Sequence, residues 1–425
     1  MDLQLAKGVQ DIAPEDKILM NEVVGKLKDV FELFGFAPLE TPIIERYETL
    51  GAKFAAGEAS DALKEIFQLT DQGGRKLGLR FDLTVPLCRF VAMNPTLKLP
   101  FKRYELGVVF RDGPLKAGRT RQFWQCDFDT VGSESMLADA EILAVLEKGF
   151  SSLGIDVQIK YNNRKLLNGL MEQIGVKEKE SALIAIDKLD KIGKEGVKKE
   201  LIERGLTAKQ SEEILSLIKT GVSLEQLKSK ITNAEALQGI KELEEMFSYT
   251  TKLGLKKIVF DASLARGLAY YTGTVFEVYA QEGKITSSLA GGGRYDDMIG
   301  KFMGGSRLIP ALGASYGIVP ILEILKEKAK VRSKSPAQVY VVPINTVNES
   351  LDLVQELRNR NISADISLGK KGVSKNLEYA SALGIPYVII LGEDELKKKK
   401  VLLRDMKSGT EQLLSTEAVI NKLRS

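Results

Sequence analysis

The sequence predicts an α+β chain in which an antiparallel sheet is interrupted by a helical insertion and followed by a small α/β domain. Three observations support this fold class. Paired strand patterns joined by turns recur in two separate parts of the chain, residues between them repeat apolar side chains at helical spacing, and strands alternate with helices beyond residue 336. We therefore expect four segments, with the limits 1–164, 165–255, 256–328 and 336–425.

Composition excludes several kinds of protein. The chain has 425 residues, of which 44% are hydrophobic and 28% charged, as is ordinary for a globular protein. No apolar run is long enough to span a bilayer, and the first residues lack the apolar core of a secretory signal. We therefore expect a cytoplasmic protein with no membrane partner.

The chain contains no histidine. This excludes Ser-His-Asp catalysis, cysteine–histidine pairs and every histidine-ligated metal. With only Cys88 and Cys126, a disulfide scaffold and a cysteine zinc site are excluded as well. Acid–base chemistry therefore falls to Asp, Glu, Lys or Tyr, or to the substrate.

The N-terminal elements are predicted from turn residues and spacing. A helix begins at Pro14, carries acidic residues in its first turn and ends at Gly35. The stretch Phe36–Ile44 is extended because each of its prolines disfavours a helical predecessor. It suits either a subunit interface or an internal edge strand. A hairpin joins Ile66–Leu69 to Lys76–Phe81, and we place Asp82 and Thr84 on one side of the strand that continues from it.

The central hairpin spans residues 101–132. Its strands, Tyr104–Phe110 and Arg121–Thr130, are joined by a turn-rich link that carries arginines. Gln125, Asp127 and Asp129 alternate along the second strand, so they share one face. Carboxylates beside guanidiniums suit a ligand that has both phosphates and a cationic or hydrogen-donating part. The alternative is an exposed edge hairpin with surface ion pairs.

The remaining elements follow the same patterns. In residues 137–318 we expect a helix at Leu137–Leu153, a strand at Val157–Tyr161, helices within 165–255, and strands at Lys256–Phe260, Leu264–Glu277, Leu289–Asp297 and Ile309–Ile318. After a linker at Lys328–Pro336, we expect strands at Val339–Pro343, Tyr387–Leu391 and Val401–Asp405, and helices at Ser350–Asn359, Ser374–Leu383 and from about Ser415. Three consecutive glycines, Gly291–Gly293, allow a backbone to approach a ligand or a strand closely. They are neither a P-loop nor a Rossmann fingerprint.

These motifs resemble those of the class II aminoacyl-tRNA synthetases, specifically the histidyl-tRNA synthetase family, over essentially the whole chain. The matching stretches are Lys7-Gly8-Val9-Gln10-Asp11-Ile12 with Pro14, Pro42 in motif 1, residues 101–132 as motif 2, Leu264–Glu277 and Ala290–Asp296 as the two histidine signatures, and 338–425 as the anticodon-binding domain. The resemblance implies a class II antiparallel-sheet catalytic domain with a helical insertion, plus a small α/β C-terminal anticodon-binding domain. It also implies a homodimer.

The family's reaction joins the histidine carboxylate to the α-phosphate of ATP and then passes histidine to tRNA(His). The resemblance implies catalytic roles for Arg111 and Arg266, and ATP contacts for Arg111, Arg119 and Phe123. The residues that it implies for binding L-histidine are Asp82, Leu83, Thr84, Arg111, Gln125, Asp129, Arg266, Tyr270, Tyr271 and Tyr295. Mg²⁺ is implied with ATP, through ligands that the sequence does not assign.

Two positions depart from the family pattern. Gly113 stands where motif 2 has a glutamate two places after its arginine, and Pro320 stands where motif 3 has an arginine that packs on adenine. Arg307 is a nearby candidate to replace that arginine. We expect ATP to bind less tightly than in relatives that have the motif 3 arginine.

Two other kinds of protein fit parts of the sequence. A non-catalytic paralogue that senses histidine and regulates ATP phosphoribosyltransferase is favoured by the missing motif 3 arginine. Against it stand Arg111, Arg266, Phe123 and the C-terminal domain. A tRNA-binding module is a third alternative, but such a protein would not need the amino-acid pocket that these motifs imply.

Overall fold

The computed structural model describes residues 3–51, 65–114, 120–219, 221–266, 270–305, 307–328, 333–369 and 372–424. Two compact units divide the chain. One holds Met1–Gln10 and Val23–Ile324, and the other holds Asp11–Glu22 and Leu325–Ser425. No helix in the described part of the chain is both long and apolar enough to cross a membrane.

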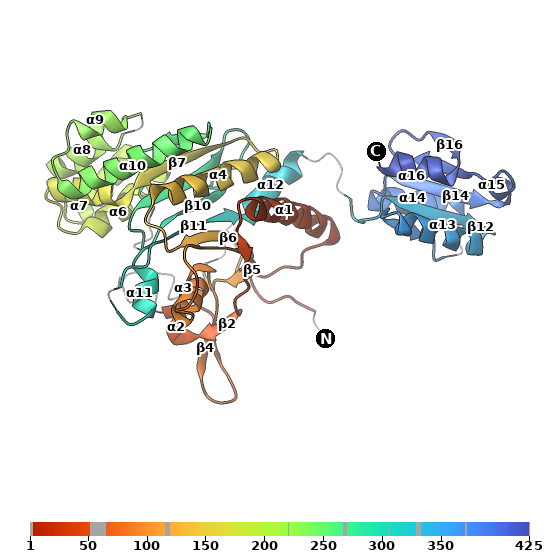
Figure 1. The fold of residues 1–425 in the computed structure, drawn as a ribbon, viewed down its shortest axis with the longest axis horizontal. Helices are drawn as coiled ribbons and strands as arrows, with labels where there is room; N and C mark the ends of the chain where they lie inside the picture. Colours follow the sequence, from red (N-terminus) through yellow and green to blue (C-terminus); the bar gives the residue numbers. More distant parts are fainter. Residues whose placement is uncertain are drawn as a thin grey trace. The chain divides into compact units, whose positions relative to one another are not determined.

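An eight-stranded sheet organises the first unit (Figure 1), with the strand order β1-β5-β6-β11-β10-β9-β7-β8. Neighbouring strands are antiparallel except at the two edges, where β1 pairs with β5 and β7 pairs with β8 in parallel. The strands are β1 (Ala37–Pro38), β5 (Phe101–Phe110), β6 (Gln122–Val131), β7 (Val157–Asn163), β8 (Ile258–Phe260), β9 (Thr274–Ala280), β10 (Ala290–Arg294) and β11 (Ala311–Gly317). The predicted central hairpin is therefore confirmed as β5–β6, and β5 begins three residues before the expected start.

Aromatic packing covers one face of this sheet. Phe31, near the end of α1 (Pro14–Leu33), packs on Phe128 of β6 and Tyr316 of β11, with ring centroids 5.0 and 6.1 Å away. The helix α4 (Met136–Ser152) runs beside them, and the Tyr316 hydroxyl donates a 3.0 Å hydrogen bond to the Val145 carbonyl. The side chains that alternate with these, on the opposite face, are left to form a site.

A small three-stranded sheet precedes the central hairpin. It contains β2 (Ile44–Arg46), β3 (Gln68–Thr70) and β4 (Lys76–Leu79), and α2 (Tyr47–Gly51) follows β2. The expected strand through Asp82 and Thr84 is wrong. Thr84 begins a helix, α3 (Thr84–Met93), and the Asp82 carboxylate accepts a 3.0 Å hydrogen bond from the Val85 N–H in its first turn. The apolar residues of α3 hide helical periodicity because they occupy most of its positions.

Six helices lie between β7 and β8 in the described residues, in the part of the sequence predicted to be helical. They are α5 (Arg164–Gln173), α6 (Lys179–Ile186), α7 (Leu189–Glu203), α8 (Ala208–Leu217), α9 (Leu224–Lys228) and α10 (Ala234–Lys252). The exact limits of the insertion, 165–255, stay a prediction.

The segment expected as a strand at Leu264–Glu277 is only partly extended. Regular pairing begins at Thr274, and Arg266 has a backbone φ of +41° that no strand accommodates. Residues 267–269 of this motif lie outside the described residues. The sequence also did not predict two helices that flank β11, namely α11 (Met298–Phe302) and α12 (Ile318–Lys328).

The second unit contains a five-stranded sheet with the order β13-β12-β14-β15-β16. Its elements are β12 (Val339–Ile344), α13 (Val347–Asn359), β13 (Ala364–Ile366), α14 (Val373–Leu383), β14 (Tyr387–Gly392), α15 (Glu393–Lys397), β15 (Val401–Asp405), β16 (Glu411–Leu414) and α16 (Thr416–Arg424). The predicted α/β alternation is confirmed. The strands β13 and β16 and the helix α15, which are three to five residues long, were not predicted.

We predict that Gly149→Ala destabilises the first unit. A methyl group on Gly149 in α4 would lie 2.9 Å from Cζ of Tyr316 and collide with its hydroxyl. Such overpacking typically lowers the free energy of unfolding by about 1–3 kcal/mol. Denaturant unfolding measures it. Gly25→Ala, whose new methyl meets nothing within 4 Å, is the control, and an equal effect of both variants would contradict the packing described.

Candidate active site

Small residues hollow out the open face of the sheet. On this face, Gln125, Asp127 and Asp129 of β6 are paired with small residues of β11, which are Gly317, Ser315 and Gly313 in the same order. A methyl group on Gly313 would collide with the Asp129 carboxylate. Glycine at this position therefore leaves the space that the acidic side chain occupies.

The three glycines of β10 continue this hollow. A methyl group on Gly291 would collide with the Arg266 guanidinium, and one on Gly293 would lie 2.8 Å from the Tyr271 ring. Between them, Gly292 packs directly on the backbone of Gly313 and Ala314. The glycine run expected to allow close approach thus makes room for two side chains and for a neighbouring strand.

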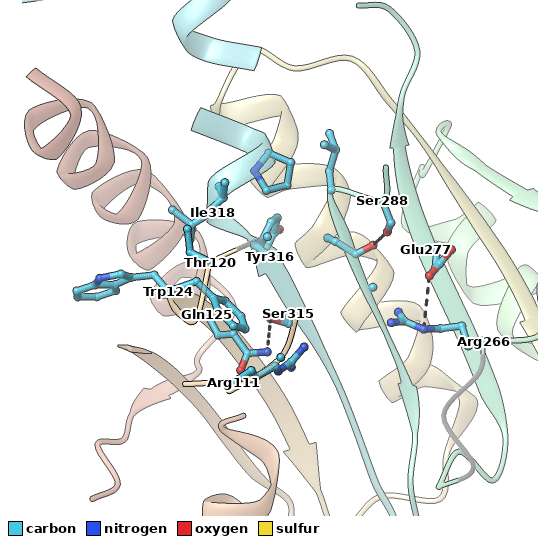
Figure 2. Close-up of a pocket in the computed structure, with 18 of the residues that line it drawn as sticks. Arg111, Thr120, Trp124, Gln125, Arg266, Glu277, Ser288, Ser315, Tyr316 and Ile318 are labelled. Atoms are coloured by element: carbon cyan, nitrogen blue, oxygen red, sulfur yellow. Dashed lines mark hydrogen bonds and ion pairs between the residues drawn. The ribbon is translucent and has the colours of Figure 1, made fainter. Parts of the chain in front are cut away.

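A cavity of about 380 Å³ lies on this face. Of the predicted substrate-binding residues, it is lined by Arg111, Phe123, Gln125 and Arg266. Figure 2 shows Arg111 beside Gln125 and Ser315 on one side, and Arg266 beside Glu277 on the other. Two guanidiniums from different elements therefore face one cavity, which suits a phosphate or a carboxylate.

Neighbouring groups fix both guanidiniums. Arg111 Nε donates a 3.1 Å hydrogen bond to the Phe81 carbonyl, and its Cζ lies 5.0 Å from the Phe123 ring centroid. Arg266 donates from Nη1 to the Phe276 carbonyl at 3.2 Å, and its Nε lies 3.6 Å from Glu277 Oε1. Burial by itself lowers the pKa of Arg266, but Tyr271 and Glu277 raise it by more. The pKa therefore lies above its ordinary value, and this arginine stays cationic.

Behind the cavity, buried acidic side chains surround one buried arginine. Arg103 on β5 is fully buried, and its Nη2 lies 2.8 Å from Asp129 Oδ2 on β6. The same guanidinium lies 3.7 Å from Glu105 Oε2 and donates to the Leu83 carbonyl at 3.1 Å. Burial raises the pKa of Asp129, while Arg103 and a hydrogen bond from Tyr295 lower it.

Three tyrosines close this end of the site. The Tyr295 hydroxyl donates a hydrogen bond to Asp129 Oδ1, and the Tyr270 ring lies edge-on to Tyr295 with centroids 6.4 Å apart. Tyr270 stacks on Tyr271 with centroids 4.5 Å apart, and Tyr271 lies 5.7 Å from the Arg266 guanidinium carbon. The tyrosines therefore form a chain of contacts from Asp129 to Arg266, which lines the cavity.

The remaining predicted site residues fall in three places. Asp82 and Leu83 lie at the start of α3, where both are buried beside Arg103 and the acidic cluster, and Thr84 opens the helix. Arg119 lies outside the described residues. Arg307, the candidate for the missing arginine, is exposed and does not line the cavity, whereas Pro320 does.

Sequence reasoning missed several residues of the site. Arg103, Glu105, Glu277 and Ser315 received no role, and Asp127 was placed on the right face without one. Arg103 and Glu105 pair with Asp129 and Asp127 across the hairpin. If the register of the hairpin is extended along β5 to residues before Tyr104, it places Arg103 opposite Asp129 and so identifies both residues.

Comparisons with known proteins show which family the chain resembles over its length. Residues 8–321 match the family model "Histidyl-tRNA synthetase", and residues 338–425 match "Anticodon binding domain". A "Histidine--tRNA ligase 1" of Bacillus cereus is 41% identical over 97% of this chain and 95% of its own length. The "Histidine--tRNA ligase" of Clostridium tetani is 37% identical over 98% of this chain and 97% of its own length.

Solved structures of similar fold cover most or all of the chain. The histidyl-tRNA synthetase of Nostoc sp. superposes with a TM-score of 0.86 at 30% identity and covers 100% of this chain and 99% of its own. A Bacillus halodurans structure titled "ATP phosphoribosyltransferase regulatory subunit/histidyl-tRNA synthetase" has a TM-score of 0.75 at 21% identity, covering 92% of this chain and 99% of its own. The latter likeness shows the fold alone.

We predict that Arg103→Met lowers the free energy of unfolding by about 3–5 kcal/mol, because it leaves buried carboxylates without their cation. Without the cation, the pKa of Asp129 in the folded state rises further above its unfolded value. The loss is therefore largest at pH 8 and shrinks as the pH falls and the carboxylates take up protons.

Denaturant unfolding at several pH values measures this effect. Arg75→Met is the matched control, because Arg75 pairs with Asp71 at 2.6 Å and its side chain is 73% exposed. Exposed pairs contribute about 0–1 kcal/mol. Equal losses in the two variants would contradict the role given to Arg103.

Proposed function

We propose that this chain, which belongs to the histidyl-tRNA synthetase family, activates histidine with ATP and transfers it to tRNA(His). The activity is that of an aminoacyl-tRNA ligase with a class II antiparallel-sheet catalytic domain and an anticodon-binding domain. The observation that carries this function is the placement of Arg111 and Arg266 on one cavity, which Ser315, the strand partner of Asp127, also lines.

The chemistry at phosphorus is an in-line displacement that needs positioned charge more than covalent help. The histidine carboxylate oxygen attacks the α-phosphate, and the bond to pyrophosphate breaks. Arg111 and Arg266 hold the α-phosphate and the attacking carboxylate and neutralise charge that builds up in the transition state. Arg111 is catalytic in this sense, and Arg266 supplies the second cation.

The remaining groups orient the two substrates. Phe123 stacks on adenine, and Arg119 meets the γ-phosphate. Asp82, Thr84 and Gln125 hold the α-ammonium group, and Leu83 belongs to the same histidine-binding segment. Asp129 and Tyr271 bind the imidazole, with Tyr270 and Tyr295 alongside. A carboxylate and a phenol together pair with both ring nitrogens, so an apolar side chain cannot replace histidine there.

Mg²⁺ accompanies ATP in this proposal. Glu277 and Ser288, whose side chains carry oxygen atoms, line the cavity, and hard cations prefer oxygen ligands. No group of three or more candidate ligands gathers in the described part of the chain. This donor set therefore fits a metal held largely by phosphate oxygens, with Glu277 and Ser288 on the protein side. The ion would neutralise phosphate charge.

Three finer points belong to the same proposal. The segments 1–164 and 256–328 form the catalytic domain around the insertion 165–255, and 336–425 form the anticodon-binding domain. A homodimer is supported by the exposed apolar side chains of Ile43 and Ile44 in the motif 1 segment. The location is the cytoplasm.

Histidine-dependent ATP–pyrophosphate exchange tests the function. We expect exchange with histidine and none with the other standard amino acids, because only histidine satisfies Asp129 and the tyrosines. Histidine binding without exchange would overturn the proposal and favour the regulatory paralogue.

We predict that Pro320→Arg lowers the KM for ATP by about fivefold, since a guanidinium stacked on adenine contributes ~1 kcal/mol or somewhat more. Pro320 lines the cavity as Phe123 does, so an arginine there is positioned to reach the base. Steady-state exchange kinetics measure this. Pro320→Ala separates the loss of proline from the gain of the cation, and an unchanged or higher KM in Pro320→Arg would contradict the prediction.

A further inference from the structure

The backbone of Arg266 has a strained conformation that other residues must hold. Its φ of +41° lies in the left-handed region, which L side chains rarely adopt and which persists only where the surrounding structure fixes it. The Arg266 side chain is fixed by β9, because Nη1 donates to the Phe276 carbonyl and Nε lies 3.6 Å from Glu277 Oε1. These contacts orient the guanidinium, but they do not hold the backbone that carries it.

A buried asparagine anchors the segment that leads to Arg266. Asn162 on β7 is fully buried, and its Nδ2 donates to the Ala262 carbonyl at 3.2 Å and to the Leu264 carbonyl at 3.0 Å. Its Oδ1 accepts a 2.8 Å hydrogen bond from the Asn163 N–H, which fixes the orientation of the amide. Both carbonyls come just before Arg266 in the chain, so this segment is bound to a strand of the large sheet.

A buried arginine approaches the next two carbonyls. Arg164 begins α5 and is 5% exposed, and its Nη1 lies 3.4 Å from the Ala265 carbonyl oxygen and 3.5 Å from that of Arg266. Burial lowers the pKa of Arg164, and the charges of Glu180 and Asp187 offset this only in part. A guanidinium with so little compensation is unfavourable to bury, and the contacts that it makes here are with the backbone at Arg266.

We propose that Asn162 and Arg164 are positioning residues, which hold the backbone of residues 262–266 so that the Arg266 guanidinium enters the cavity. This inference rests on the proposed function, in which Arg266 supplies the second cation at the α-phosphate. Neither Asn162 nor Arg164 lines the cavity, so both act through the backbone. The sequence analysis gave them no role, because they fall between the strand predicted at Val157–Tyr161 and the helical insertion.

The space around Arg266 makes its position sensitive to the backbone. The guanidinium occupies the room that Gly291 leaves free, since a methyl group there would collide with it. A displaced backbone therefore leaves the side chain little freedom to return to the same place. A misplacement of about 1 Å can cost ~100-fold in rate, because a cation stabilises the transition state only where charge develops.

Two neighbouring buried asparagines allow positioning to be separated from stability. Asn162→Leu keeps the branched shape of the side chain and removes both donors to the segment 262–266. Asn163→Leu is the matched control, because Asn163 is equally buried, follows on the opposite face of β7, and donates to Glu242 Oε2 of α10 at 2.8 Å. Both variants should melt at a lower temperature than the unmodified chain, since each leaves buried polar groups unpaired.

The two variants should differ in catalysis. We expect Asn162→Leu to lower the kcat of histidine-dependent exchange by about 10- to 100-fold relative to Asn163→Leu. The KM for histidine should change by much less than kcat, because Arg266 acts mainly on the transition state. The inhibition constant of histidinol, which lacks the carboxylate, should be the same in both variants. A general loosening of the site would weaken histidinol binding as well.

Arg164 provides an independent test. Arg164→Met removes the donor to the two carbonyls and should lower kcat, whereas Arg164→Lys keeps a cationic donor and should recover part of the rate. A double-substitution cycle then asks whether the effect passes through Arg266. In the Arg266→Lys background, Asn162→Leu should have an effect on kcat about tenfold smaller than in the unmodified chain, because coupled residues are not additive.

Exchange by the unmodified chain is measured first, and its absence would overturn the proposed function and this inference with it. With exchange present, three results would overturn the inference alone. They are an equal loss of kcat in Asn162→Leu and Asn163→Leu, a loss of histidinol binding that matches the loss of kcat, and full additivity with Arg266→Lys. If Asn162→Leu does not fold, the Arg164 variants decide, and an unchanged kcat in Arg164→Met would overturn the inference.

Discussion

The buried guanidinium of Arg103 is the interaction on which the site depends. It is fully enclosed, and it joins β5 to β6 through Asp129, approaches Glu105, and holds the carbonyl of Leu83 before α3. A protein interior accepts several carboxylates on one face of a sheet only if a cation lies among them. Arg103 thus reduces the cost of burying these carboxylates, and it lowers the pKa values of Asp127 and Asp129, which burial raises.

Alternation of side chains along the strands gives the sheet one packed aromatic face and one polar face. Phe128 and Tyr316 pack under α1 and α4 on one face, while Asp127, Asp129 and Ser315 occupy the other. Glycines on β10 and β11 then remove side chains where Arg266, Tyr271 and Asp129 need room. Rigid strands hold most of the site, and the strained backbone at Arg266 is the exception, a kind of strain that often accompanies function.

Much of this arrangement could be predicted from the sequence. Two strand-like runs and a turn-rich link identify β5–β6, and parity alone places Gln125, Asp127 and Asp129 together. Elements that lack such a pattern were missed. The helix α3 contains Pro86 and is apolar on most sides, so neither spacing nor a cap marked it. Arg103 was missed because its role depends on strand register, and the register of a hairpin is set by pairing that one strand does not reveal.

The departures from the family pattern leave this core intact. Gly113 and Pro320 line the cavity, whereas Arg103 and the acidic side chains behind it do not. In the proposed function, both departures therefore concern the nucleotide, and the charged groups proposed to bind histidine are retained. A crystal structure with histidine bound tests this most directly. We expect the imidazole between Asp129 and the tyrosines, and the ammonium within hydrogen-bond distance of Asp82 and Gln125. Histidine bound away from the face of β6 would contradict the account.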